Sequence, residues 1–251
     1  MKTILYYFTG TGNSLYLTQQ LSVLIPNSEI RCVTEYKGNV HSKCMIGIIF
    51  PVYMWTLPNI ITDFANKLRY DDSCYVFSIA NYGGLPGKAL QNLDELLKKN
   101  NTKSLSSGFY IHMPGNYYPM YGGAAEDKQK KLFEEAKKKL VSIAEKLKNQ
   151  PVLKLEKSHA VIDSIMYKAL SKNITKVKDE DSNFIVSDKC KGCGLCVSKC
   201  PVNNIKLENN KPVWTHNCEA CMACLQYCPN AAIGYKGVKA NRKRYTNPLV
   251  K

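Results

Sequence analysis

The sequence has no long apolar run, no export signal and little arginine. No apolar stretch among its 251 residues approaches the roughly 20 needed to cross a bilayer. The first residues, Met1 to Phe8, run directly into glycine-rich sequence, without the longer apolar stretch and small-residue cleavage site of an export signal. We therefore expect a soluble, cytoplasmic protein. In that reducing compartment the 11 cysteines, an odd number, favour metal ligation over disulfides.

Arginine is scarce although the chain is basic. The formal net charge is +15, and only four of the 35 basic residues are arginine. Residues 1–122 carry +3 of this charge and residues 123–251 carry +12. Lysine is a solvated point charge without the forked guanidinium that reads nucleic-acid bases. We therefore interpret the excess first as a solvated surface, second as a docking face for an acidic redox protein, and only third as a nucleic-acid site; we expect no nucleic-acid partner.

Strand and helix patterns alternate over the first 150 residues. Five short apolar runs rich in Ile, Val, Tyr and Phe are typical of strands that are buried on both faces. These runs cover residues 4–8, 30–33, 45–50, 75–80 and 109–113. Amphipathic stretches lie between them, and a longer one follows the last strand. The alternation predicts an α/β fold with a parallel, doubly wound sheet, which binds ligands beyond the carboxyl ends of its strands.

The chain divides into four segments. Residues 1–150 form the α/β unit, and residues 151–182 are a partly helical connector with a helix predicted over residues 160–174. Residues 183–237 hold an internal repeat, because the cysteine-rich segment from Cys190 recurs 28 residues later from Cys218. So short a segment buries little apolar surface, and something else must hold it together. Residues 238–251 form a basic tail that we expect to be frayed.

The cysteine repeat has a regular spacing, since each half reads C-x2-C-x2-C-x3-C-P. This pattern resembles bacterial two-cluster ferredoxins, in which three closely spaced cysteines hold one 4Fe-4S cluster and the fourth ligates the other cluster. The resemblance implies one cluster on Cys190, Cys193, Cys196 and Cys228, and a second on Cys218, Cys221, Cys224 and Cys200. A pair of zinc sites is the alternative, although zinc usually joins two distant C-x2-C pairs. Cys32, Cys44 and Cys74 are isolated and are interpreted as small buried apolar residues.

A glycine-rich loop lies between the first strand and the first helix. Its residues are Thr9, Gly10, Thr11, Gly12, Asn13 and Ser14. The glycines permit unusual backbone angles, the other side chains offer hydrogen-bond donors, and the helix start presents free N–H groups, a combination that can enclose a phosphate. The loop has no lysine, so it is not a nucleoside-triphosphate loop, and it lacks the third glycine of the dinucleotide pattern. A phosphate monoester fits best; a plain turn with a helix cap is the alternative.

The loop resembles the phosphate loop of flavodoxins, which bind FMN. That resemblance implies a five-stranded sheet in the order 2-1-3-4-5. It also implies that two later loops contact the flavin ring: Tyr53, Met54 and Trp55 after the third strand, and Asn81, Tyr82, Gly83 and Gly84 after the fourth. Aromatic side chains can stack on the ring, and glycine-rich backbone can approach its polar edge. Apolar packing is the alternative for each aromatic residue taken alone.

Taken whole, the chain resembles flavodoxin and ferredoxin fusion proteins, the iron-sulfur flavoproteins of anaerobic bacteria and archaea. The resemblance implies two 4Fe-4S clusters and FMN, and an electron-transfer protein or flavin-dependent reductase. Its partners would be an acidic redox protein or a small-molecule electron donor or acceptor. One alternative is a cluster-based redox or iron sensor with a non-catalytic flavodoxin-like domain; another is a basic nucleic-acid-binding iron-sulfur protein. His112, after the fifth strand, is a candidate proton donor, although a lone histidine is usually structural.

Overall fold

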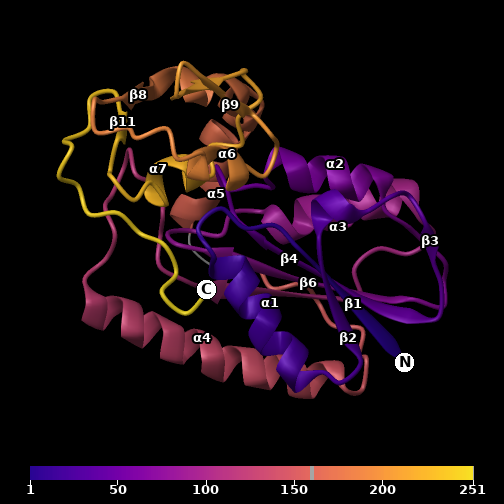
Figure 1. Ribbon diagram of the computed structural model, residues 1–251. Helices are drawn as coiled ribbons and strands as arrows, with labels where there is room; N and C mark the ends of the chain where they lie inside the picture. The colour runs from indigo at the N-terminus through magenta and orange to yellow at the C-terminus, as the bar shows by residue number, and fades with distance from the viewer. Residues whose placement is uncertain (159–160, 251) are drawn as a thin grey trace.

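The protein is described here by a computed structural model that covers residues 1–158 and 161–250 (Figure 1). Its main sheet, within that part of the chain, is formed by five parallel strands: β1 (Lys2–Tyr7), β2 (Ser28–Cys32), β4 (Cys44–Pro51), β6 (Tyr75–Tyr82) and β7 (Ser107–His112). Their order is β2-β1-β4-β6-β7. Two short strands, β3 (Val40–His41) and β5 (Arg69–Tyr70), pair with each other outside this sheet. Counted within the sheet, the order is the predicted 2-1-3-4-5, which confirms the flavodoxin-like fold.

Helices cover both faces of the sheet. The helices α2 (Asn59–Lys67) and α3 (Ala89–Asn100) pack on one face, where Ile48 and Phe50 of β4 meet Phe64 of α2 and Leu93 of α3. On the opposite face lie α1 (Asn13–Leu24) and α4 (Glu126–Leu147), which pack on residues such as Ile49 and Phe77. Both faces of β4 and β6 are therefore buried, which explains why these strands read as continuous apolar runs.

The cysteine-rich part is a small α+β unit beside the carboxyl ends of the main strands (Figure 1). Two antiparallel pairs form it: β8 (Phe184–Val186) with β11 (Ile233–Tyr235), and β9 (Ile205–Glu208) with β10 (Lys211–Trp214). A one-turn helix lies in each half of the repeat, α6 (Leu195–Ser198) and α7 (Ala223–Gln226). Its small core includes Phe184 and Leu225, and Tyr118 and Val177 from outside the repeat complete this core.

The connector links the two parts and contains a helix and a 3-10 segment. The helix predicted over residues 160–174 is α5 (Val161–Leu170), followed by the 3-10 segment η2 (Ser171–Asn183); Ala160 lies outside the described residues. A further 3-10 turn, η1 (Val33–Glu35), follows β2. Within residues 1–158 and 161–250, none of the helices combines the length and the apolar character that crossing a bilayer requires.

Tyr245 and Asn247 of the basic tail are packed against the protein, although we expected a frayed end. Tyr245 and Asn247 are only 2% and 3% exposed to solvent. The chain from residue 242 to residue 250 returns from the cysteine-rich part to the start of α1 (Figure 1). The expectation failed because the sequence shows the charge of Lys239 to Arg244 but not the distant partners of the residues that follow them.

Candidate functional site

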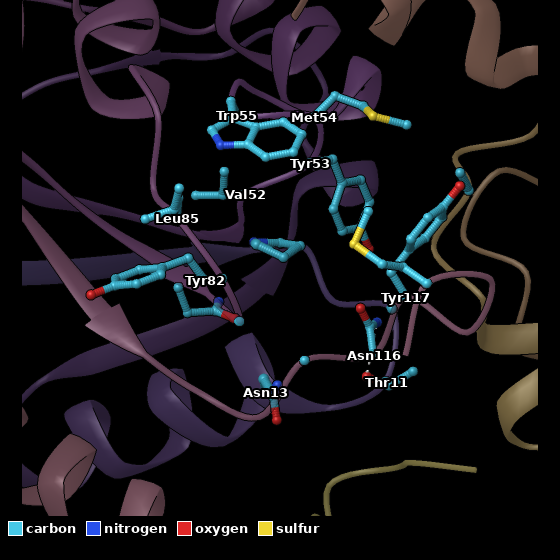
Figure 2. A pocket seen from close by; sticks show the side chains of 18 of the residues that line it. Thr11, Asn13, Val52, Tyr53, Met54, Trp55, Tyr82, Leu85, Asn116 and Tyr117 are labelled. Atoms are coloured by element: carbon cyan, nitrogen blue, oxygen red, sulfur yellow. Dashed lines mark hydrogen bonds between the residues drawn. The ribbon is translucent and has the colours of Figure 1, made fainter. Parts of the chain in front are cut away.

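A cavity of about 360 Å³ opens at the carboxyl ends of β1, β4, β6 and β7 (Figure 2). Thr11 and Asn13 lie at one end of it, and Met54 and Trp55 at the other. All the predicted flavin-site residues except Gly12 line this cavity: Thr9, Gly10, Thr11, Asn13, Ser14, Tyr53, Met54, Trp55, Asn81, Tyr82, Gly83 and Gly84. The structure therefore brings three separate loops together, as expected where parallel strands end at a common edge.

Three hydroxyl groups of the glycine-rich loop have protons available for a ligand. Thr9 Oγ1 accepts from the Gly12 N–H at 3.0 Å, and Thr11 Oγ1 accepts from Asn116 Nδ2 at 3.1 Å. Ser14 Oγ accepts from Asn81 Nδ2 at 2.6 Å. Because a hydroxyl can accept and donate at once, each remains free to donate to an oxyanion. Helix α1 also begins here without a side-chain cap, which leaves its first N–H groups for the same purpose.

Gly12 has the unusual backbone angle that was predicted for it, whereas the Asn13 side chain is used differently from the prediction. The Asn13 amide donates to the Pro114 carbonyl at 2.9 Å, and its Oδ1 accepts from Tyr245 at 2.6 Å and from Asn247 at 3.1 Å. Its side chain is thus held by the protein, although the sequence suggested a donor to phosphate. Gly12 has φ +101° and faces away from the cavity, toward Asn247, whose Cβ would lie 3.0 Å from a Cβ at Gly12.

The loops after β4 and β6, which were predicted to contact the flavin ring, are here called the first and second ring-side loops. The first of them, at residues 53–56, is a tight, strained turn. Tyr53 and Thr56 exchange two backbone hydrogen bonds, of 3.2 and 2.8 Å, and the two residues between them, Met54 and Trp55, have φ of 45° and 61°. Such angles favour Asn and Gly, so two large side chains are presented to the cavity at some cost in backbone strain. The Tyr53 hydroxyl and the Trp55 indole N–H are buried without a hydrogen-bond partner among the described residues. Burial raises the pKa of Tyr53 well above its usual value, and nearby Cys221 adds to the shift.

The second ring-side loop is held by a residue that the sequence did not suggest. Asp163 of α5 is 1% exposed, and both its carboxylate oxygens lie 3.0 Å from the Gly87 N–H. Gly87, with φ +60°, passes so close to the Trp55 carbonyl that a side chain there would overlap it. The connector therefore fixes both ring-side loops. No local pattern marks Asp163, because its partner lies 76 residues away in the sequence.

His112 lies outside the cavity lining. Its ring stacks on that of Tyr82, with centroids 5.1 Å apart and an interplanar angle of 8°, and its Nε2 lies 3.3 Å from the Gly83 carbonyl oxygen. Additional lining comes from the loop after β7 and from the connector. These additional lining residues include Asn116, Tyr117, Met120, Tyr121, Asn173 and Val177.

The eight repeat cysteines surround two separate small cavities. One is lined by Cys190, Cys193, Cys196 and Cys228, and the other by Cys200, Cys218, Cys221 and Cys224. Each cavity thus collects three cysteines from one half of the repeat and the fourth from the other half, as the crossed ligand sets require. Among the described residues, no group of three or more His, Cys, Asp or Glu side chains is arranged to hold a single metal ion.

The two cysteine sets differ in burial. Cys193 of the first set is exposed and its companions are half-buried. Cys218, Cys221 and Cys224 of the second set are buried, and burial raises the pKa of each of these thiols. Buried thiols ionise readily only when a metal centre takes the thiolate. The first set therefore faces the surface, and the second faces the interior of the protein.

The second set lies directly against the glycine-rich loop. A Cβ at Gly10 would lie 2.6 Å from the Cys221 carbonyl oxygen, so only glycine permits this approach. Asn116 Nδ2 bridges the two parts, since it donates to Thr11 Oγ1 at 3.1 Å and to the Cys221 carbonyl at 3.3 Å. Ala220, next to Cys221, is part of the cavity lining. One wall thus separates the flavin-type cavity from the buried cysteine set.

Comparison with known proteins finds one family and several structures. A family model described as a 4Fe-4S dicluster domain matches residues 182–229. A flavodoxin from the domain Archaea shares 15% identity, with a TM-score of 0.37, over 59% of this chain and 99% of that chain. An azoreductase from Bacillus anthracis str. Sterne shares 11% identity, with a TM-score of 0.38, over 59% and 100%. The two-electron reduced flavodoxin of Megasphaera elsdenii shares 15% identity, with a TM-score of 0.37, over 57% and 98%. A search of curated proteins finds no match.

The fold and the family match agree with each other. The strand order of the main sheet makes the N-terminal part flavodoxin-like, and residues 182–229 of the cysteine-rich part match the model of a 4Fe-4S dicluster domain. The chain thus joins a flavodoxin-like unit to a segment that is similar to 4Fe-4S dicluster domains, as the resemblance drawn from the sequence implies.

Proposed function

We propose that this protein is an electron-transfer iron-sulfur flavoprotein that passes electrons between an external redox carrier and FMN by way of two 4Fe-4S clusters. The observation that carries the proposal is the shared wall, where Cys221 of the buried cysteine set lies against Gly10 of the glycine-rich loop. Electron tunnelling falls steeply with distance, so this contact favours direct transfer between the two sites. A flavin at the opposite end of the molecule would have argued against it.

The two cysteine sets suggest the order of transfer. We assign one cluster to Cys190, Cys193, Cys196 and Cys228, and the other to Cys218, Cys221, Cys224 and Cys200. The first set is the accessible one and would exchange electrons with the carrier; the second, being buried beside the cavity, would connect it with the flavin. This arrangement gives a one-electron carrier access to a site that can collect two electrons.

The cavity suits FMN and a neutral substrate. Thr9, Thr11 and Ser14 would donate to the phosphate, together with the first N–H groups of α1. Tyr53 and Trp55 would supply donors to the polar edge of the ring, which satisfies two buried polar atoms. When bound, the flavin supplies one- and two-electron chemistry. None of the lining residues of the described chain is Asp, Glu, Lys, Arg or His, which favours an uncharged acceptor if the protein is a flavin-dependent reductase.

The test begins with anaerobic reconstitution and quantification of iron, sulfide and flavin. The loaded protein is then mixed with a reduced viologen dye, and reduction of the flavin is followed by its absorbance. We expect fast flavin reduction in the natural protein and in the control Cys32→Ser, whose thiol lies outside both cysteine sets. Cys228→Ser, which removes a ligand of the exposed set, should slow it markedly.

Two outcomes would contradict the proposal. Protein that binds iron and sulfide but no flavin would favour the alternative of a cluster-based redox or iron sensor. Flavin reduction that is equally fast in Cys228→Ser and in the natural protein would show that electrons do not enter through the exposed cluster.

A further inference from the structure

We propose that residues 242–250, here called the C-terminal strap, hold the glycine-rich loop in its phosphate-binding conformation, with Tyr245 and Asn247 as positioning residues. The inference rests on the proposed FMN site and adds to it a contribution from a segment more than 220 residues away in the sequence. The strap leaves the cysteine-rich part and ends beside the start of α1 (Figure 1).

The strap is fixed firmly at its beginning. The Arg244 guanidinium donates to the carbonyl oxygens of Leu225, Ala231 and Ile233, the last two at 3.1 and 2.7 Å. The Tyr245 N–H donates to Gln226 Oε1 at 2.7 Å, and Gln226 lies on α7 between two cluster cysteines. These partners belong to the cysteine-rich part, residues 183–237. The Arg242 guanidinium also donates to the Tyr118 and Pro119 carbonyls of the flavodoxin-like unit, at 2.6 and 2.8 Å, so the strap is anchored to both parts of the chain.

The strap then controls the orientation of Asn13, the first residue of α1. The Tyr245 hydroxyl and Asn247 Nδ2 both donate to Asn13 Oδ1, at 2.6 and 3.1 Å. These two bonds fix which way the Asn13 amide points, so that its Nδ2 donates to the Pro114 carbonyl at 2.9 Å. Asn13, Tyr245 and Asn247 are all buried, which makes each bond costly to lose.

The strap also contacts the backbone of the loop. The Asn247 N–H donates to the Thr11 carbonyl at 2.8 Å, and the Asn247 Cβ fills the space behind Gly12. Thr11 and Gly12 lead directly into α1 and therefore set the direction of its first N–H groups. The described part of this loop contains no cationic side chain, so a phosphate here depends on oriented N–H and O–H dipoles. The strap therefore acts on the phosphate end of the cavity, and its contacts with Asn13, Thr11 and Gly12 do not involve the ring-side loops.

The test compares FMN with riboflavin, which has the same ring but no phosphate. Free flavin is measured after ultrafiltration of the iron-loaded protein. Loss of the hydroxyl in Tyr245→Phe should weaken FMN binding about 5-fold, and the double variant Tyr245→Phe, Asn247→Ala about 20-fold. Riboflavin binding should change less than about 2-fold in both, because the ring contacts are intact. Tyr75→Phe is the matched control: its buried hydroxyl bonds Ser107 and Pro151, away from the cavity, and it should leave both affinities unchanged.

The outcomes separate this inference from the function it rests on. If the natural protein binds no FMN, the proposed function fails. If it binds FMN and the Tyr245 and Asn247 variants lose FMN and riboflavin affinity equally, the strap supports general folding and the inference is overturned. Unchanged FMN affinity in the double variant would overturn it as well. Iron content, measured in each sample, should stay at the natural level.

Discussion

Replacing Gly10 with alanine should force the glycine-rich loop away from the buried cysteine set, which includes Cys221. The new methyl carbon would lie 2.6 Å from the Cys221 carbonyl oxygen, 2.9 Å from the Tyr53 hydroxyl and 3.1 Å from the Cys221 Cβ. The φ angle of Gly10 lies outside the left-handed region, so alanine meets no backbone strain of that kind, and the effect is one of space. The obstacle is mainly backbone, which cannot rotate away as the end of a flexible side chain could.

The size of the effect follows from this overlap. An ordinary carbon–oxygen contact needs about 3.4 Å, so the Cys221 loop must move by roughly 0.8 Å or the Gly10 loop must yield. Overpacking of this kind costs about 1–3 kcal/mol. For a chain of this length a loss of about 2 kcal/mol lowers Tm by about 4–8 °C. Flavin reduction through the clusters should also slow, because the flavin-type cavity and the buried cysteine set move apart.

The assay compares Gly10→Ala with Gly84→Ala under identical conditions. Gly84 lines the same cavity, but a methyl group there would meet nothing within 4 Å. We expect the unfolding temperature to fall in Gly10→Ala and to stay near the natural value in Gly84→Ala, and the rate of flavin reduction by reduced viologen to fall in Gly10→Ala relative to the natural protein. Equal unfolding temperatures of the two variants would refute the close approach of Gly10 and Cys221.

Three further predictions concern residues around the fold and the site. Asp163→Ala leaves the Gly87 N–H buried and unpaired, so it should lower the free energy of unfolding, measured in urea, by about 2 kcal/mol. It should also weaken the binding of FMN and of riboflavin equally, and a loss of affinity for FMN alone would contradict this role. Burial and, to a smaller extent, the charges of Arg31 and Lys2 lower the pKa of His41 in the folded protein. The unfolded chain therefore binds a proton at this histidine at a higher pH than the folded protein does, and the free energy of unfolding should fall as the pH drops below about 6.5. His41→Gln should reduce that fall between pH 7.5 and pH 5.5, and an unchanged fall would disprove the assignment. His112→Gln should leave turnover and its pH profile unchanged, because the ring stacks on Tyr82 outside the cavity lining; a shifted profile would restore His112 as a proton donor.

The strap and Asp163 suggest why the two parts occur in one chain. The strap, which follows the cysteine-rich part, holds the glycine-rich loop through Tyr245 and Asn247, and the connector holds the loop after β6 through Asp163. On this view the flavin-type cavity is completed by segments outside the flavodoxin-like unit. Strap variants should therefore weaken the binding of FMN more than that of riboflavin, whereas Asp163→Ala should weaken the binding of both flavins equally.

Much of the protein was determined by local patterns in its sequence. The apolar runs predicted all five strands of the main sheet to within three residues at either end, because strands buried on both faces must be continuously apolar. The glycine-rich loop and the two ring-side loops follow such strands, so their meeting at one edge could be inferred from strand direction alone. The resemblance of the cysteine repeat to two-cluster ferredoxins likewise implied two crossed sets, and each set lines one cavity.

Only the tertiary structure decided how these parts support one another. The partners of Asn13 lie 232 and 234 residues along the chain, and the partner of Asp163 lies 76 residues away. Contacts over such separations leave no periodicity or spacing in the sequence, since they depend on how finished elements pack. For the same reason the sequence predicted a frayed tail and a free donor at Asn13, whereas the tail residues Tyr245 and Asn247 are buried and bind Asn13. Composition and periodicity determine which elements form, whereas packing decides which of their polar groups meet.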